Sequence, residues 1–445
     1  MDFTSKTPIN KGWSGDKKYC VTTADGAKYL LRVTPFEKSA NRENMYLMQK
    51  EVEKLGVPMC KPVDFGKCDE GVYTLQTWID GKDAEEVVPY LADSEQYALG
   101  LEAGRILKII HSIPAPDDQP DWEERFNKKM DRKIQMYNDC PIKFDGAEHI
   151  IDYIEANRHL LKNRPQSYQH GDYHIGNMML ENGRIVIIDF DRYDFGDPWE
   201  EFNRIVWCAQ SAPLFASGIV NGYFDDNVPL DFWKLLALYI SSNMLSSIPW
   251  AIPFGEGEVQ TMLGQAKDVL EWYDNMKNPV PKWYIQTINQ YAETYSDPPE
   301  RVRIAGRGIV VCDGKILLSH ELNTGVYMTP GGGLEEGETL EECCIRELLE
   351  ETGYEVKPIR RFLTINEYSF ETKYVSNYFI CEVTGKGSQT LTDIEVEHGI
   401  VPEWVKTEDA LAIFGAFDTK TPDVRSLYIR ELTTINKYLK ITKRP

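Results

Sequence analysis

The N-terminal part of the chain alternates short apolar and β-branched runs with turn residues. Residues 18–23 and 28–33 have the composition of strands, and Asp25-Gly26 between them favours a tight hairpin turn. A helix is expected at 44–55 and a further strand at 72–81, which would lead out of this region. This order predicts a small lobe of antiparallel strands with one helix over residues 1–80.

The next part of the chain has mainly helical periodicity. In 98–111 the apolar residues recur at helical spacing, so this helix is expected to be core scaffold, with His111 in a structural role. Segment 235–254 has no charged residue over about the length that crosses a bilayer. It contains several serines and two prolines, and we therefore expect a buried helix of a mostly helical large lobe over residues 81–295.

From residue 301 the pattern changes to strands, after two Pro-containing stretches that punctuate the link. Strands are expected at 302–311, 315–319, 362–367 and 374–383, with helices at 339–353 and 424–439. Helices placed between and after the strands predict an α/β/α sandwich over residues 300–445.

Composition limits the functions that are open. The chain has 445 residues, a net charge of -21 and nine cysteines without a Cys-x-x-Cys pair. An acidic chain is poorly suited to neutralise nucleic-acid phosphates, and scattered cysteines are typical of a reducing compartment. The first residues lack the basic-then-apolar pattern of a secretory signal. We expect a cytoplasmic protein with small-molecule substrates and no nucleic-acid or membrane partner; the oligomeric state stays open.

Residues 332–354 carry more chemical information than any other segment. They read GGLEEGETLEECCIRELLEETGY. Thr339 with Glu342 three residues later is a capping box, and Gly353 is a natural helix stop. A helix should therefore begin after Thr339 and end before Gly353.

This helix carries three glutamates on one face. Glu347, Glu350 and Glu351 have the spacing i, i+3 and i+4, so their like charges repel one another. A divalent cation would remove this repulsion, and Mg2+ prefers such oxygen ligands. Arg346 is expected to pair with a carboxylate and hold it in place. A solvated acidic helix face is the simpler alternative.

Written as a pattern, the segment is G-x5-E-x7-R-E-L-x-E-E-x-G-Y, which resembles the signature of the Nudix hydrolases. Only Tyr354 departs, at a position where an aliphatic residue is usual. The resemblance implies hydrolysis of diphosphate linkages in nucleoside diphosphates linked to another group. It implies catalytic roles for Arg346, Glu350 and Glu351, and Mg2+ or Mn2+ bound by Glu347, Glu350 and Glu351. A further carboxylate of this family often follows the helix, and here the candidates are Glu395 and Glu397.

A second motif lies far upstream. Residues 170–177 read H-G-D-Y-H-I-G-N, and the apolar run that follows ends in I-I-D-F-D at 187–191. The offset from Asp172 to Asn177 equals that of the protein-kinase catalytic loop, and Asp189 falls where the metal-binding Asp of kinases belongs. This version resembles the branch of aminoglycoside phosphotransferases and choline kinases, over about two thirds of the chain. It implies that Asp172 orients the acceptor hydroxyl and takes its proton, and that Asn177 and Asp189 hold metal ions.

The resemblance also assigns a nucleotide site, with ATP or GTP as phosphoryl donor. It places Ser14 in a glycine-rich loop and Arg32 where kinases carry a phosphate-binding Lys. Arg and Lys are not interchangeable at such sites, so Arg32 is a departure. Glu43 is the expected partner of Arg32. Thr77 and Ile79 are expected to bind adenine through their backbone.

The acceptor pocket is expected among residues 190–285. Its candidates are chosen by location alone: Trp199, Glu200, Glu201, Trp207 and Tyr223. The acidic charge of the chain would suit a cationic acceptor such as an aminoglycoside, or it simply keeps the surface soluble.

These patterns predict an α+β protein-kinase-like bilobal domain followed by an α/β/α Nudix sandwich. The function expected from them is bifunctional: ATP-dependent phosphorylation of a small-molecule hydroxyl, and Mg2+-dependent hydrolysis of a nucleoside-diphosphate-type linkage. The alternative is a Nudix pyrophosphohydrolase in which the kinase-like domain binds nucleotide as a sensor or regulator. The acceptor, the Nudix substrate and the donor nucleotide stay open.

Overall fold

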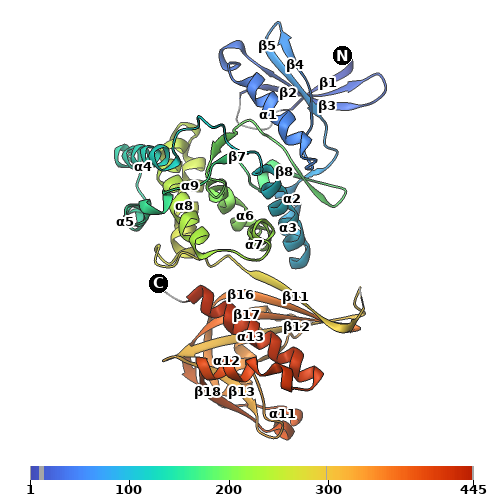
Figure 1. Cartoon of the computed structure of the whole chain (residues 1–445), viewed down its shortest axis with the longest axis vertical. Coiled ribbons are helices and arrows are strands. Elements are labelled where there is room, and N and C mark those ends of the chain that lie inside the picture. The colour runs from blue at the N-terminus through green and yellow to red at the C-terminus, as the bar shows by residue number, and fades with distance from the viewer. Residues whose placement is uncertain (1, 10–14, 297, 443–445) are drawn as a thin grey trace. The chain divides into compact units, whose positions relative to one another are not determined.

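The computed structural model describes residues 2–9, 15–296 and 298–442 and divides into two units (Figure 1). The first unit is Met1–Pro281 and the second unit is Lys282–Pro445. Each is described by itself. The boundary lies at the first of the two Pro-containing stretches that mark the link in the sequence.

The small lobe of the first unit is a twisted antiparallel sheet with one helix beside it (Figure 1). The strands pair in the order β1-β2-β3-β5-β4. Their bounds are Phe3–Ile9 (β1), Lys17–Thr23 (β2), Lys28–Thr34 (β3), Pro62–Cys68 (β4) and Gly71–Thr77 (β5), and α1 spans Arg42–Lys54. Val21, Leu31, Val33 and Leu75 form the buried core of this sheet. The hairpin β2–β3 and α1 lie where the sequence predicts them; β1 and β4 are additional strands.

The large lobe is mostly helical and carries short strands at its upper edge (Figure 1). Its longer helices are α3 (Asp93–Ile110), α4 (Trp122–Asp139), α5 (Ala147–Asn157), α6 (Ile205–Ser211), α7 (Pro213–Phe224), α8 (Leu230–Ala251) and α9 (Glu256–Trp272), and α2 (Ala84–Val87) is short. Its strands are β6 (Lys82–Asp83), β7 (Ser167–Gln169), β8 (Met178–Glu181), β9 (Arg184–Ile187) and β10 (Asp194–Gly196). The order β6-β8-β9 and the pair β10-β7 frame the loop 170–177.

Helix α8 contains the long uncharged segment noted in the sequence. By length and composition, the helical stretch Leu230–Phe254 passes for a membrane-crossing helix, but 67% of its most apolar window is buried inside the protein. Leu236, Leu238 and Ile240 have no exposed surface. The prediction of a buried large-lobe helix is confirmed.

The second unit is built around a mixed sheet. In its described residues the strands pair in the order β11-β16-β17-β12-β13-β14, with β15 on β12 and β18 on β13. The strands are β11 (Gln286–Tyr295), β12 (Arg301–Cys312), β13 (Lys315–Glu321), β14 (Val326–Met328), β15 (Gly331–Gly333), β16 (Tyr354–Phe370), β17 (Thr372–Lys386) and β18 (Ile400–Lys406). The helices are α10 (Leu340–Thr352), α11 (Asp393–His398), α12 (Thr407–Gly415) and α13 (Pro422–Thr442).

Alternating side chains divide this sheet into two buried faces. Ile316 and Leu318 pack in a cluster with residues of α12 and α13, whereas Leu317 packs in a second cluster with residues of α10. Successive residues of a strand point to opposite faces, so helices cover both sides of the sheet. The predicted α/β/α sandwich is confirmed.

Strand β11 corrects the expected domain border. Residues 286–295 were placed in the large lobe, which was expected to extend to 295. Instead β11 pairs in parallel with β16, with Gln286 opposite Leu363, and so belongs to the second unit. The sequence of β11, QTINQYAETY, is mostly polar, and this obscures the strand in the sequence.

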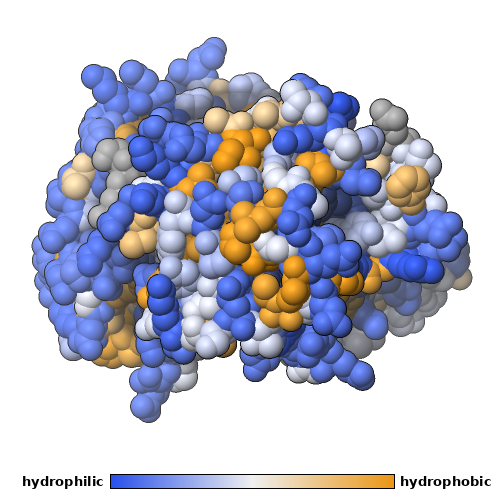
Figure 2. Space-filling model, turned by 90° about the horizontal axis from the view of Figure 1, so that it is seen from below, coloured by the Kyte–Doolittle hydropathy of each residue, from blue (hydrophilic) through white to orange (hydrophobic). Residues whose placement is uncertain are grey.

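The surface is dominated by charged and polar side chains, as the composition implies. Figure 2 shows one face, on which hydrophobic residues form a broken strip among hydrophilic ones. Exposed large hydrophobic side chains of the second unit include Tyr291, Val302, Phe370 and Ile394.

Candidate active sites

The loop 170–177 is held by a buried carboxylate. Glu201 accepts hydrogen bonds from the backbone N–H of Gly171, at 3.0 Å to each oxygen, and from that of Tyr173 at 3.3 Å. His170 is fully buried, and its Nε2 lies 3.0 Å from the carbonyl oxygen of Ile188. These bonds fix the loop against the segment that carries Asp189.

Asp172 is surrounded by hydrogen-bond donors and basic side chains. The Nδ2 of Asn177 donates to its Oδ2 at 3.1 Å. Arg204 Nε lies 3.4 Å from Oδ1, Arg192 Nη1 lies 3.5 Å from Oδ2, and His174 Nε2 lies 3.8 Å from Oδ1. Burial alone would raise the pKa of Asp172, but the nearby His174 ring and the charges of Arg204 and Arg192 outweigh it and hold the pKa well below its usual range. Asp172 is therefore ionised at neutral pH.

Asp189 and Arg32 meet between the two lobes. Arg32 Nη2 donates to Asp189 Oδ1 at 3.3 Å, and Arg32 also pairs with Asp191. Arg42 pairs with Asp191 at 2.7 Å and with Asp16 at 2.6 Å. Burial would raise the pKa of Asp189, but the charge of Arg32 overcomes this and lowers it. Asp189 has a positive φ of 64°, a conformation that non-Gly residues rarely adopt.

The expected pairing of Arg32 with Glu43 is wrong. Glu43 is exposed, and among the described residues the ion-pair partners of Arg32 are Asp16, Asp189 and Asp191. Consecutive residues of a helix point about 100° apart. Because Arg42 faces the interior, its neighbour Glu43 faces solvent.

The hinge retains one of its two expected backbone contacts. The N–H of Thr77 donates to the carbonyl of Lys61 at 2.9 Å, so it is already used inside the sheet. Trp78 N–H lies 3.4 Å from the carbonyl of Lys28. In the hydrogen bonds of the described residues, the amide of Ile79 has no partner. Ser14 lies outside the described residues.

The five acceptor candidates have mainly structural positions. Tyr223 is buried and its hydroxyl lies 3.0 Å from His111 Nδ1, which agrees with a structural His111. Glu200 pairs with Lys129 at 3.0 Å, and Glu201 holds the loop. Trp199 lies under the guanidinium of Arg164. Trp207 also borders the loop, with its ring 6.2 Å from that of His174.

The oxygen atoms near Asp189 suit a hard divalent cation. Asn177 donates its Nδ2 to the backbone and side chain of Asp172, and no hydrogen bond of the described residues uses its Oδ1. The carboxylate of Asp189 adds further oxygen atoms. Carboxylate and amide oxygens are the ligands that Mg2+ or Mn2+ prefers, so Asn177 and Asp189 fit the expected metal ions.

In the second unit, helix α10 begins and ends as predicted. The Thr339 side chain accepts from Glu342 N–H at 3.2 Å, Glu342 accepts in return from Thr339 N–H at 2.9 Å, and Gly353 adopts the left-handed conformation. Arg346 donates to both oxygens of Glu338, at 2.8 and 2.9 Å, and also to Glu347 at 2.8 Å. The predicted role of Arg346 in holding a carboxylate agrees with these contacts, and Glu338 is its bidentate partner.

Glu351 and Glu347 point inward from α10. Glu351 Oε2 accepts from the Ser319 hydroxyl at 2.7 Å and from Gly331 N–H at 3.3 Å. Burial raises the pKa of Glu351 to about 7, against the lowering effect of the Ser319 hydrogen bond. Burial also raises the pKa of Glu347, and the nearby charges of Glu350 and Glu395 add to this. A side chain at Gly332 would collide with Glu347, since a Cβ there would lie 2.3 Å from its carboxylate.

Of the two later acids, Glu395 is the one whose charge acts on Glu347. It also caps α11, accepting from Thr392 N–H at 2.7 Å. Glu397 uses its backbone carbonyl to accept from Asn323.

The carboxylates of α10 suit a cation but are not already gathered around one. In the part of the chain that the structure describes, no three His, Cys, Asp or Glu side chains converge on a metal position. Glu350 is tied to Arg346 at 3.2 Å. Burial raises the pKa values of Glu347 and Glu351, and a hard cation bound there would stabilise their ionised forms.

Comparison with known proteins agrees with both sites. A family model described as "Phosphotransferase enzyme family" matches residues 6–233, just over half of the chain. The chain belongs to this family. A model described as "NUDIX domain" matches residues 302–425, and a MutT-like protein of Streptomyces ambofaciens is 31% identical over 144 residues, covering 31% of this chain and 91% of that protein. The chain is thus an enzyme with a phosphotransferase domain followed by a Nudix domain, as predicted.

Other relatives match the Nudix domain only in part. An NAD-capped RNA hydrolase NudC of Vibrio atlanticus (strain LGP32) is 52% identical over 52 residues, 11% of this chain and 19% of that protein. An ADP-ribose pyrophosphatase of Methanocaldococcus jannaschii is 37% identical over 87 residues, 18% of this chain and 52% of that protein. For three such relatives the chain spans only 15% to 27% of their length.

Solved structures resemble the phosphotransferase domain. Aminoglycoside phosphotransferase APH(4)-Ia, in a ternary complex with AMP-PNP and hygromycin B, has a TM-score of 0.48 at 15% identity, over 60% of this chain and 94% of that chain. The gentamicin complex of APH(2")-IIa has a TM-score of 0.45 at 17% identity, over 59% of this chain and 91% of that chain. Likeness at this level supports no statement about substrate.

Several residues of these sites carry no strong signal in the sequence. Arg204 and Arg192 reach Asp172 from outside its motif, and Glu201 was named only for its location. Asp16 directly follows the glycine-rich loop, and Asp191 ends the I-D-F-D run, so position relative to a motif is the signal that points to them.

Proposed function

We propose that the protein is a bifunctional enzyme. Its phosphotransferase domain transfers the γ-phosphoryl group of ATP or GTP to a small-molecule hydroxyl. Its Nudix domain hydrolyses a diphosphate linkage in a compound of the nucleoside-diphosphate type. The observation that carries the proposal is that each unit holds its own carboxylate site, built on Asp172 in one and on Glu351 in the other.

In the phosphotransferase domain, ionised Asp172 accepts a hydrogen bond from the acceptor hydroxyl and orients its oxygen. Phosphoryl transfer passes through a loose transition state, so orientation matters more than early removal of the proton. The low pKa of Asp172 is therefore compatible with this role. Asn177 and Asp189 would hold Mg2+ or Mn2+, which neutralises phosphate charge when bound. Arg32 and the backbone of Ile79 contact the nucleotide.

In the Nudix domain, Glu351 has a pKa of about 7 and can take a proton from an attacking water at neutral pH. Glu347, Glu350 and Glu351 would hold Mg2+ or Mn2+, which polarises the diphosphate when bound. Arg346 positions Glu347 and Glu350 through hydrogen bonds. Gly332 keeps the space that Glu347 needs.

A second candidate is a phosphotransferase domain that binds nucleotide as a sensor and transfers nothing. The observation that favours it is the engagement of Arg32, which pairs with Asp189 itself as well as with Asp191. A nucleotide and its metal ions have to break these pairs before transfer. The sensor would need only the binding step.

A metabolite screen with two separate readouts tests the proposal. Purified protein is incubated with ATP, Mg2+ and a broad panel of hydroxyl compounds, and with a panel of nucleoside diphosphate derivatives. The proposal expects a phosphorylated product in the first panel and diphosphate cleavage in the second. Tight ATP binding with no transfer to any acceptor supports the sensor instead. The same screen, extended to NAD-capped RNA, checks the prediction that nucleic acid is not a substrate. Subcellular fractionation checks the proposed cytoplasmic location.

A further inference from the structure

Two arginine side chains lie beside the single carboxylate of Asp172. Arg204 and Arg192 lie 3.4 and 3.5 Å from its two oxygens. In the described residues neither guanidinium donates a hydrogen bond that meets ordinary geometry, and Arg204 Nε is buried without a partner. A buried guanidinium N–H that is left unused is costly, and this applies to Arg204, whereas the side chain of Arg192 is exposed. Their free donors are therefore available to a ligand that approaches Asp172.

Helix α4 carries a further basic side chain near Arg204. Lys133 is half-buried, 3.5 Å from Asn243 Oδ1. Burial lowers its pKa to about 7, and the charges of Lys129, Arg204 and Arg132 lower it further while Glu200 opposes them. Lys133 therefore lies within electrostatic reach of Arg204.

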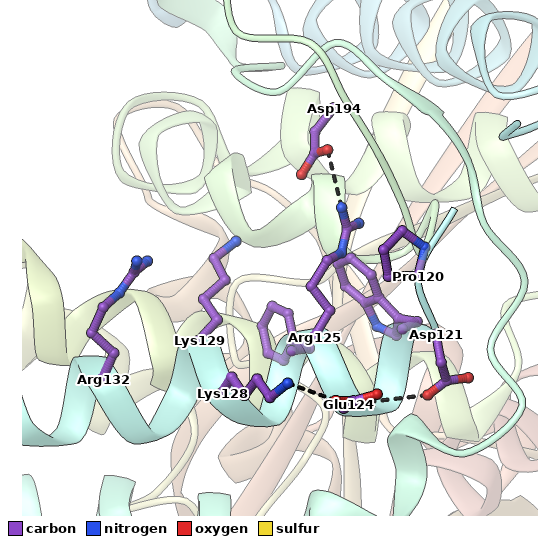
Figure 3. A pocket seen from close by; sticks show the side chains of 10 residues that line it. Pro120, Asp121, Glu124, Arg125, Lys128, Lys129, Arg132 and Asp194 are labelled. Atoms are coloured by element: carbon purple, nitrogen blue, oxygen red, sulfur yellow. Dashed lines mark hydrogen bonds and ion pairs between the residues drawn. The ribbon is translucent and has the colours of Figure 1, made fainter. Parts of the chain in front are cut away.

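Further basic side chains line the same helix. Figure 3 shows Arg125, Lys129 and Arg132 extending from one side of α4 beside a hollow of about 480 Å³. Arg125 is paired with Asp194, two residues beyond Arg192. The basic side of α4 therefore adjoins the segment that carries Arg192.

The acids close to these cations are already committed. Glu200 accepts from Lys129 at 3.0 Å and from Gln169 at 3.3 Å. Glu201 accepts from the backbone of the catalytic loop. Asp172 is the carboxylate that lies beside both Arg204 and Arg192, Glu200 is within electrostatic reach of Arg204, and Lys133 and Arg132 are further basic groups on this side of the site.

We propose that the phosphoryl acceptor is an anionic hydroxyl compound, whose phosphate or carboxylate is held by Arg204 and Lys133 while its hydroxyl faces Asp172. In the transfer, the acceptor oxygen bonds to the γ-phosphorus, the bond to the nucleoside diphosphate breaks, and the hydroxyl proton passes to Asp172. This specificity rests on the proposed kinase activity. A cationic acceptor such as an aminoglycoside would place its ammonium groups against Arg204 and Arg192, which costs free energy.

The nucleotide is the competing explanation for these cations. Arg204 and Lys133 come from the segment 200–204 and from α4, both in the large lobe. The proposed nucleotide contacts Arg32 and Ile79 come from the small lobe and the hinge. If these cations bind the acceptor, a change at Arg204 should weaken acceptor binding. If they bind the nucleotide, the same change should weaken nucleotide binding.

Four hexose compounds of different charge provide the test. Glucose 6-phosphate, gluconate, glucose and glucosamine are titrated by calorimetry into the protein saturated with ADP and Mg2+, so that the nucleotide site is filled. We expect glucose 6-phosphate and gluconate to bind more tightly than glucose, and glucosamine most weakly. Arg204→Gln and Lys133→Met should each weaken binding of the two anions by about tenfold, the loss of one charge-assisted hydrogen bond, and leave glucose unchanged. Lys267→Gln, an exposed lysine on α9, is the matched control and should change nothing.

The outcomes separate this inference from the proposed function. Glucosamine binding as tightly as glucose 6-phosphate, no measurable binding of glucose 6-phosphate, or an equal loss for all four compounds would overturn the anionic acceptor. Weaker ADP binding in Arg204→Gln, with the hexose series unaffected, would assign Arg204 to the nucleotide and also overturn it. Transfer from ATP to cationic acceptors alone would keep the kinase and reject the anionic acceptor. Anion-selective binding without transfer to any acceptor would keep the anion site and reject the kinase.

Discussion

The two carboxylate sites of the molecule differ in how their charge is compensated. In the first unit Asp172 lies within 3.5 Å of two arginine side chains, and its pKa is held low. In the second unit Glu351 is buried with a hydroxyl and a backbone N–H as its hydrogen-bond donors, and its pKa rises to about 7. Arginine side chains outweigh burial at Asp172, whereas burial outweighs the charge of Arg307 at Glu351.

This difference indicates how each site relates to metal ions. The Nudix site concentrates negative charge that Arg346 only partly balances, so a cation from solution gains affinity even without substrate. The phosphotransferase site already balances Asp172 and Asp189 with arginines. Metal ions are expected to enter there together with the nucleotide, whose phosphates supply the missing negative charge.

Removal of divalent cations is expected to have the largest effect. A chelator should abolish both phosphoryl transfer and diphosphate hydrolysis, and Mg2+ should restore them. Calorimetry with Mn2+ on nucleotide-free protein should show binding that Glu351→Gln removes and Asp189→Asn leaves intact. Binding that depends instead on Asp189 would reverse the contrast between the sites. Activity that survives the chelator would reject the metal assignment of that site.

Separate loss of the two reactions is the next largest effect. Asp172→Asn removes the carboxylate that orients the acceptor and should lower phosphoryl transfer by about 100-fold or more, with hydrolysis unchanged. Glu351→Gln should lower hydrolysis by a similar factor, with transfer unchanged. Asp117→Asn and Glu341→Gln, which change exposed acids of the same units, serve as controls.

Initial rates of both reactions on all four variants measure this separation. Loss of both reactions from one substitution, in a protein that melts normally, would show that the sites are coupled. The comparison between two independent sites would then fail.

A smaller effect is expected at Arg32. Arg32→Ala removes a phosphate contact but also frees Asp189 and Asp191 from their pairs, so the Michaelis constant for ATP should rise by about tenfold. Arg32→Lys keeps the charge, so its Michaelis constant for ATP should lie between those of Arg32→Ala and the wild type. Unchanged nucleotide binding by calorimetry would make Arg32 a structural residue that only balances the acids, and would favour a nucleotide site elsewhere.

Local patterns in the sequence predicted the parts of both sites that a single segment builds. The start and end of α10 follow from Thr339, Glu342 and Gly353, whose capping preferences act within a few residues. The spacing of Asp172 and Asn177 likewise fixes their hydrogen bond, since both belong to one loop. The burial of α8 was predicted from the uncharged, largely apolar segment 235–254, whose serines do not suit a lipid-exposed helix.

The parts that were missed depend on contacts between distant segments. Arg204 reaches Asp172 across 32 positions of sequence, and no local preference reports that distance. Glu43 is not the partner of Arg32, because Glu43 faces solvent and Asp189, which pairs with Arg32, lies 157 positions away in the sequence. Strand β11 was assigned to the wrong unit because its paired residues in β16 lie 77 positions away in the sequence, as for Gln286 and Leu363.

The most direct test of the contrast is the stability of each site at two pH values, without metal. The folded-state pKa of Glu351 is raised above the 4.5 of an unfolded chain, so its ionisation costs stability as pH rises from about 4.5 through 7. One pKa unit corresponds to about 1.4 kcal/mol, so Glu351→Gln should stabilise the second unit at pH 8 by up to about 3 kcal/mol and have little effect at pH 5. Ionisation of Asp172 has the opposite effect on stability. Its folded-state pKa is lowered, so the stability that it contributes is present above about pH 4 and is lost as the pH falls below that.

Hydrogen–deuterium exchange of metal-free protein at pH 8 measures both signs in one experiment. Peptides from α10 should exchange more slowly in Glu351→Gln than in the wild type, and peptides from the loop 170–177 should exchange faster in Asp172→Asn. Faster exchange of α10 in Glu351→Gln, or unchanged exchange of the loop in Asp172→Asn, would contradict the account that arginine side chains outweigh burial only at the first site.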